Sequence, residues 1–136
     1  MRLKELAQDG VHIFALEGEI DFHFSPALRA MLQAKLNGRC PALILDFSAV
    51  EFIDSRGIAT ILEYVRDCAE YGGIICLAAL NPIIKPVIDV VRLDKVMPIF
   101  GTVTEAVRAL KGQSKIADLA AAMAAGIDDK GETVSR

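Results

Sequence analysis

The 136-residue chain contains no tryptophan, and its aromatic content is only 6%. It also lacks a block of basic residues, because 15 basic and 18 acidic residues are spread along the chain and give a net charge of −3. Binding of single-stranded nucleic acid usually relies on exposed aromatic side chains, and phosphate binding relies on a basic surface. The composition therefore argues against a nucleic-acid partner.

No uncharged run of the sequence is long enough to span a bilayer. The longest, residues 71–84, has 14 residues and contains two glycines and a proline, whereas a membrane helix needs about 20 apolar residues. The first residues include Lys4, Glu5 and Asp9 and lack the apolar core of a secretion signal. We therefore expect a cytoplasmic protein that is not inserted in a membrane.

Cysteine and histidine are also scarce. The three cysteines form no Cys-x-x-Cys pair and lie among apolar residues, so we expect buried thiols. The two histidines, His12 and His23, have no further ligand at metal-binding spacing. Phosphate-binding loops, the dinucleotide-binding glycine pattern and common hydrolase motifs are missing. The sequence therefore favours a non-enzymatic protein without a metal or a cofactor.

The chain does contain a regular alternation of apolar strands and amphipathic helices. Continuous apolar runs, at 42–45 and 74–78, are typical of strands that are covered on both faces. We predict strands at 3–8, 11–17, 42–45, 74–78 and 96–100, and helices that begin near residues 25, 54, 81 and 102. This order indicates one α/β domain over residues 1–112, with a mixed or parallel sheet and helical cover.

Each predicted helix begins at a residue that can cap it. Ser25 and Asp54 can accept hydrogen bonds from the first backbone amides of their helices. Asn81 is followed by Pro82, just as Ser25 is followed by Pro26, and proline is favoured at the first helical position. Thr102 and Glu105 have the spacing of a capping box. These residues predict where the four helices start.

Ser55 is the candidate for a regulatory site. It lies at a helix start beside Arg56 and Gly57, where an anion would meet free backbone amides and the positive end of the helix dipole. A phosphate on Ser55 would add about −1.5 to −2 charges to the surface. Asp21 and Asp54 are loop carboxylates that could do acid–base work. From the residues alone, ordinary helix caps or solvated loop residues are the preferred interpretation of all three side chains.

The segment LDFSAVEFIDSRGIA, residues 45–59, resembles the signature of STAS domains and in particular of anti-sigma-factor antagonists. The resemblance extends to residues 16–21, 71–73, 81–82 and 93–100, and covers nearly all of residues 1–112. It implies a mixed sheet of four to five strands with about four helices, mainly on one face.

The resemblance also implies a binding module that is switched by phosphorylation and catalyses nothing itself. In this family a serine kinase of the histidine-kinase-like ATPase class modifies the serine after the aspartate, which is Ser55 here. The unmodified protein binds that kinase or an anti-sigma factor, and a PP2C-type phosphatase resets the modified form. The resemblance places Asp21, Asp54, Ser55, Arg56 and Gly57 on or beside the partner-binding surface.

The sequence departs from the family pattern at Arg56, where many members have serine or threonine. A guanidinium group at this position could bind the phosphate through two parallel hydrogen bonds, or it could simply face solvent. Two alternative functions stay open. The chain could be an interaction subunit of a transporter or signalling complex in which Ser55 only caps a helix, or a nucleotide-sensing module that binds an anion at the helix start.

Residues 113–136 form a C-terminal extension beyond the minimal domain. Its apolar residues could line one face of a short Ala-rich helix: Ile116, Leu119, Ala120, Met123 and Ile127. A polar, disordered tail would follow over residues 128–136. Such a helix could dock on its own domain, bind a partner or support a homodimer.

Overall fold

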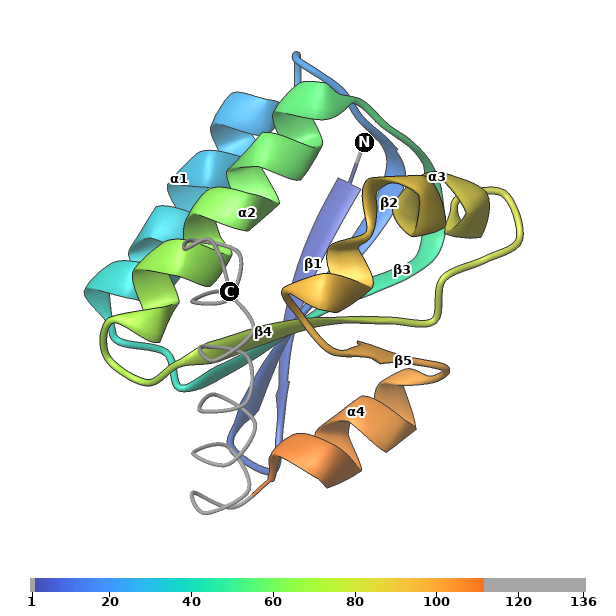
Figure 1. The fold of residues 1–136 in the computed structure, drawn as a ribbon. Coiled ribbons are helices and arrows are strands. Elements are labelled where there is room, and N and C mark those ends of the chain that lie inside the picture. Colours follow the sequence, from blue (N-terminus) through green and yellow to red (C-terminus); the bar gives the residue numbers. More distant parts are fainter. Residues whose placement is uncertain (1, 112–136) are drawn as a thin grey trace, which may run out of the picture.

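The computed structural model describes residues 2–111, which form a five-stranded sheet with helices on both faces (Figure 1). The strands lie in the sheet in chain order: β1 (Arg2–Gln8), β2 (Val11–Ile20), β3 (Ala42–Ile53), β4 (Ile74–Ala78) and β5 (Ile99–Phe100). β1 and β2 pair antiparallel, and the other neighbours pair parallel. The predicted mixed sheet is confirmed.

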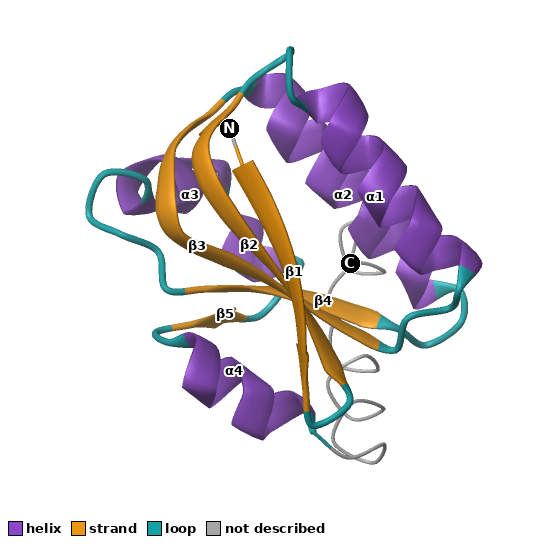
Figure 2. Ribbon diagram, turned by 180° about the vertical axis from the view of Figure 1, so that it is seen from behind, coloured by secondary structure: helices purple, strands orange, loops and turns teal. Residues whose placement is uncertain are grey.

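Within residues 2–111, three α-helices and a 3-10 helix cover one face of the sheet and one α-helix covers the other (Figures 1 and 2). The helices are α1 (Ser25–Asn37), α2 (Ser55–Ala69), α3 (Lys85–Val91), the 3-10 helix η1 (Leu93–Lys95) and α4 (Val103–Leu110). α1 and α2 lie side by side, and α4 packs on the opposite face. The expectation of helices mainly on one face is therefore confirmed.

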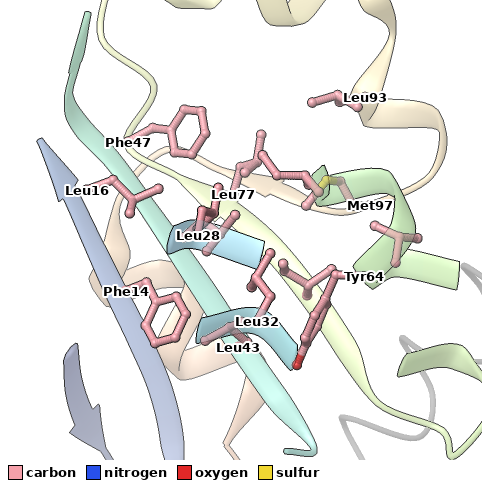
Figure 3. Close-up of a cluster of buried hydrophobic side chains, with 14 of the residues drawn as sticks. Phe14, Leu16, Leu28, Leu32, Leu43, Phe47, Tyr64, Leu77, Leu93 and Met97 are labelled. Atoms are coloured by element: carbon pink, nitrogen blue, oxygen red, sulfur yellow. The ribbon is translucent and has the colours of Figure 1, made fainter. Parts of the chain in front are cut away.

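Side chains of β3 alternate between two hydrophobic clusters. Leu43, Leu45 and Phe47 join the cluster under α1, α2 and α3 (Figure 3), whereas Ala42 and Ile44 pack against α4. β3 and β4 are central strands, so every residue from 42 to 45 and from 74 to 78 is buried. Burial on both faces explains why these strands are continuous apolar runs instead of alternating ones.

β3 is longer than the sequence predicts. We expected a strand over 42–45 followed by a loop, but pairing with β2 continues to Ile53 through two register irregularities. The side chain of Asn81 supports this stretch by donating to the carbonyls of Phe47, Ser48 and Val50 at 3.3, 3.1 and 2.7 Å. The bulged pairing breaks the apolar periodicity, which is why the pattern does not reveal the strand.

β5 is shorter than predicted, because only Ile99 and Phe100 pair with β4 instead of residues 96–100. The Leu77 amide donates to the Pro98 carbonyl at 3.1 Å, but proline has no N–H to return the bond. Val96 and Met97 are buried in the core ahead of the strand.

Two of the four residues predicted to cap helices do so in the structure. The Asp54 carboxylate accepts from the Gly57 amide at 2.9 Å, and Thr102 forms the expected capping box. The prediction for Ser25 is wrong, because its hydroxyl donates to the Asp21 carbonyl and no side chain caps α1. Asn81 accepts from two amides of the turn that precedes α3, so it stabilises that turn and not the helix itself.

Residue 1 and residues 112–136 lie outside the described residues, and with them the predicted C-terminal helix and tail. Among residues 2–111, every helix is too short or too polar to cross a bilayer.

Candidate functional site

The ends of β2 and β3 bring the predicted site residues together. The Asp54 amide donates to the Ile20 carbonyl at 3.1 Å, which holds the start of α2 beside the loop that begins at Asp21. Ser55 is the first residue of α2 and is exposed. The fold therefore presents Ser55 at the surface, directly after Asp54 and at the strand ends where the loop of Asp21 begins.

Gly57 lies beneath this surface. A Cβ atom at Gly57 would come within 2.8 Å of both the Ile20 Cγ2 and the Ile53 Cγ1 atoms, and within 3.1 Å of the Ile20 carbonyl oxygen. We expected Gly57 among the residues that contact a partner, but it is buried. Its role is to let the first turn of α2 lie directly against the ends of β2 and β3.

Asp21 is half-buried and organises the turn before α1. Its carboxylate accepts from the amides of His23 and Phe24 at 3.0 and 3.2 Å. The same residues, together with Gly18, Glu19 and Glu51, line an open hollow of about 470 Å³. Asp21 thus has a structural role in the loop and still contributes negative charge beside Ser55.

Arg56 is exposed, and its guanidinium makes no ion pair or hydrogen bond within residues 2–111. Its backbone carbonyl accepts from the Thr60 hydroxyl at 2.8 Å. The backbone is therefore anchored while the side chain is available to bind a group added to Ser55.

The start of α2 can accept an anion but does not activate Ser55 as a nucleophile. Asp54 caps the Gly57 amide, whereas the amides of Ser55 and Arg56 have no partner within the described part of the chain. Free amides at a helix start stabilise a nearby negative charge. Among residues 2–111 no side-chain base is hydrogen-bonded to the Ser55 hydroxyl, and an activated serine nucleophile needs such a base.

The remaining chemistry-bearing groups lie elsewhere. Within residues 2–111 no three His, Cys, Asp or Glu side chains gather as metal ligands would. Cys40, Cys68 and Cys76 are free and buried, as predicted. Burial raises the pKa of the Cys68 and Cys76 thiols from 9.0 to about 12, so they are protonated at neutral pH and poorly nucleophilic.

The buried thiols predict that the protein loses stability above pH 9. Between pH 9 and 12 the unfolded chain releases these protons while the folded chain retains them, so the free energy of unfolding falls as pH rises. From pH 7.5 to pH 10 each thiol should contribute a loss of about 1.4 kcal/mol. Urea unfolding at pH 7.5 and at pH 10 measures this loss of free energy of unfolding. The Cys76→Ala variant should lose less stability between the two pH values than the unaltered protein. An equal loss in both would contradict the prediction.

Sequence reasoning did not find a set of exposed apolar side chains near the site. Phe22, beside Asp21, is 53% exposed. A stripe of aliphatic residues on and before α3 is also exposed: Ile83, Val87, Val90 and Val91. α3 lies at the same end of the sheet as the start of α2 (Figure 1). The signal in the sequence was the density of aliphatic residues over 87–91, which is more than one buried helix face needs.

Comparison with known proteins agrees with the fold. The family model of the STAS domain matches residues 4–106. An anti-sigma F factor antagonist of Paenibacillus polymyxa is 30% identical over 103 residues, which cover 75% of this chain and 88% of that protein.

Solved structures give the same result. An anti-sigma factor antagonist from Mycobacterium paratuberculosis is 30% identical and superposes with a TM-score of 0.74. The superposition covers 82% of this chain and 94% of the Mycobacterium chain. The phosphorylated form of the Bacillus cell fate determinant SpoIIAA shares the fold, with a TM-score of 0.63 at 22% identity over 79% of this chain and 97% of its own. The chain belongs to the STAS domain family and is related to its anti-sigma-factor antagonists.

Proposed function

We propose that this protein is a phosphorylation-gated antagonist of an anti-sigma factor in a bacterial partner-switching pathway. With Ser55 unmodified it binds an anti-sigma factor or a serine kinase of the histidine-kinase-like ATPase class, and with Ser55 phosphorylated it releases that partner. The observation that carries the proposal is the exposed hydroxyl of Ser55 at the start of α2, beside two free backbone amides. The names of the relatives support the partner class.

The proposed binding surface combines polar and apolar parts. Asp21, Asp54, Ser55 and Arg56 provide its polar part, and Gly57 shapes it from below. The exposed aliphatic stripe on and before α3 provides apolar area at the same end of the molecule. Exposed apolar patches of this kind on a small protein commonly mark a protein-binding surface.

A phosphate on Ser55 would act on this surface through charge and hydration. The group carries about −1.5 to −2 charges and must lose water to enter an interface. Glu19, Asp21 and Glu51 already make the neighbouring hollow acidic, so the phosphate raises the density of negative charge there. The free amides and the Arg56 guanidinium stabilise the modified state, and Arg56 would slow its hydrolysis by a PP2C-type phosphatase.

The direct test is mass spectrometry of the protein from its native cells during growth and stress. Trypsin releases residues 40–56 as one peptide, which contains Ser48 as well as Ser55. We expect one phosphate on this peptide, placed on Ser55 by fragmentation, in an amount that changes with the condition. Peptides that are unmodified in every condition, or modified only on Ser48, would contradict the proposal and favour a STAS subunit that binds partners without phosphorylation.

A further inference from the structure

The outer edge of β4 is only partly covered by β5. In β4 the amide of Ile74 donates to the Pro41 carbonyl on the β3 side, and the amide of Leu77 donates to the Pro98 carbonyl on the β5 side. Peptide groups alternate along a strand, so the N–H and C=O of Ile75 must point to the β5 side. Pairing with β5 begins only at Leu77.

The peptide groups of Ile75 therefore have no partner within the described residues, although Ile75 is buried. It is only 2% exposed, yet neither its N–H nor its C=O has a hydrogen-bond partner among residues 2–111. If β5 began earlier, the backbone amide of residue 98 would donate to the Ile75 carbonyl, but residue 98 is proline and has no N–H. Because buried peptide groups without partners are rare and costly, these two groups call for a hydrogen-bond partner from outside residues 2–111.

The chain that follows α4 leaves from a suitable place. α4 runs from β5 toward the hairpin between β1 and β2 (Figures 1 and 2), and its last residue, Leu110, packs in one cluster with Ile74. A span of four residues, 112–115, can bridge up to about 14 Å. Since Leu110 already packs in one cluster with the first residue of β4, a linker of this reach is compatible with an element that starts at residue 116 and lies along the open edge of β4.

The same stretch of sequence has the chemistry that the edge needs. Gln113 and Ser114 carry side chains that both donate and accept hydrogen bonds. The apolar positions of one helical face follow directly: Ile116, Leu119, Ala120, Met123 and Ile127. The edge itself lies between two helical layers, because Ile75 packs in the α2 cluster and its neighbours Ile74 and Cys76 pack in the α4 cluster.

We propose that residues 116–127 of the same chain dock on the open edge of β4, between α2 and α4, and that this element and the polar linker residues Gln113 and Ser114 before it shield the peptide groups of Ile75. The family match ends at residue 106, so this element would complete the sheet edge from outside the matched domain. A flat sheet edge left open invites pairing with other chains, and covering it with a helix prevents that.

The test compares two identical substitutions in the full chain. Ala120→Asp introduces a charge on the predicted apolar face, and Ala125→Asp introduces it on the opposite face of the same predicted helix. Amide hydrogen exchange measured by NMR should show the Ile75 amide exchanging at least about tenfold faster in Ala120→Asp, and within about twofold of the unaltered rate in Ala125→Asp. The amides of Ile74, which donates to the Pro41 carbonyl just before β3, and of Cys76, which pairs with β3, should stay protected and report that the fold is intact.

Several results would overturn the proposal. The two variants could exchange equally, or the Ile75 amide of the unaltered protein could exchange as fast as the exposed Gly10 amide. Protection that falls on dilution would assign the cover to a second copy. Should Ala120→Asp fail to fold, nuclear Overhauser contacts between the Ile75 amide and methyl groups of residues 116–127 in the unaltered protein decide the question, and their absence refutes it.

Discussion

Ser55→Asp is expected to weaken binding of the anti-sigma factor or serine kinase by at least about tenfold, which corresponds to about 1.4 kcal/mol. Ser55→Ala should bind like the unmodified protein and stay bound in the presence of active kinase and ATP. The reason is that an aspartate brings one of the charges of a phosphate to the exposed start of α2, where that charge must be desolvated when a partner binds. Titration calorimetry with the purified partner measures both variants.

The expected loss of binding cannot be attributed to unfolding, because the two effects have opposite signs. Aspartate in the first turn of a helix interacts favourably with the helix dipole, by about 0.3 to 1 kcal/mol. Ser55→Asp should therefore melt at or slightly above the temperature of the unaltered protein. Ser48→Asp is the matched control, since Ser48 is also exposed but lies within β3. Equal weakening by both substitutions would remove the special role of Ser55.

The sequence revealed the elements whose signals are local. The apolar runs of β3 and β4 marked central strands because those segments are buried on both faces. Thr102 and Glu105 marked the start of α4 because a capping box needs only two side chains and the adjoining backbone. Ser55 and Asp54 could be placed at the start of α2 for the same reason.

The parts that could not be predicted depend on distant contacts or on a choice between competing local hydrogen bonds. The second half of β3 is supported by Asn81, which lies 31 to 34 residues away along the chain. Ser25 does not cap α1, because the Asp21 carboxylate takes the nearby amides and the Asp21 carbonyl takes the serine hydroxyl. The exposure of Val87 and Val91 depends on which side of α3 meets the sheet, and a short apolar helix does not reveal that.

The burial of Gly57 is a further tertiary effect, and it leads to a prediction whose sign opposes helix propensity. In an isolated helix, alanine is more favourable than glycine by about 1 kcal/mol. In this protein a Cβ atom at residue 57 would lie 2.8 Å from the side chains of Ile20 and Ile53, which hold their positions in the core. Gly57→Ala should therefore destabilise the fold by about 1 to 3 kcal/mol.

Urea unfolding measures this effect, with Gly38→Ala as the matched control. Gly38 follows α1 with a φ of −84°, and a Cβ atom there would meet only the Ala34 and Lys35 carbonyl oxygens at 3.6 and 3.9 Å. That variant should be neutral or slightly more stable. Because the clash pushes the first turn of α2, and Ser55 with it, away from β2 and β3, Gly57→Ala should also weaken partner binding although the Ser55 hydroxyl itself is unaltered. If both glycine variants are equally stable, then the contact of α2 with Ile20 and Ile53 is not what holds Ser55 at the surface.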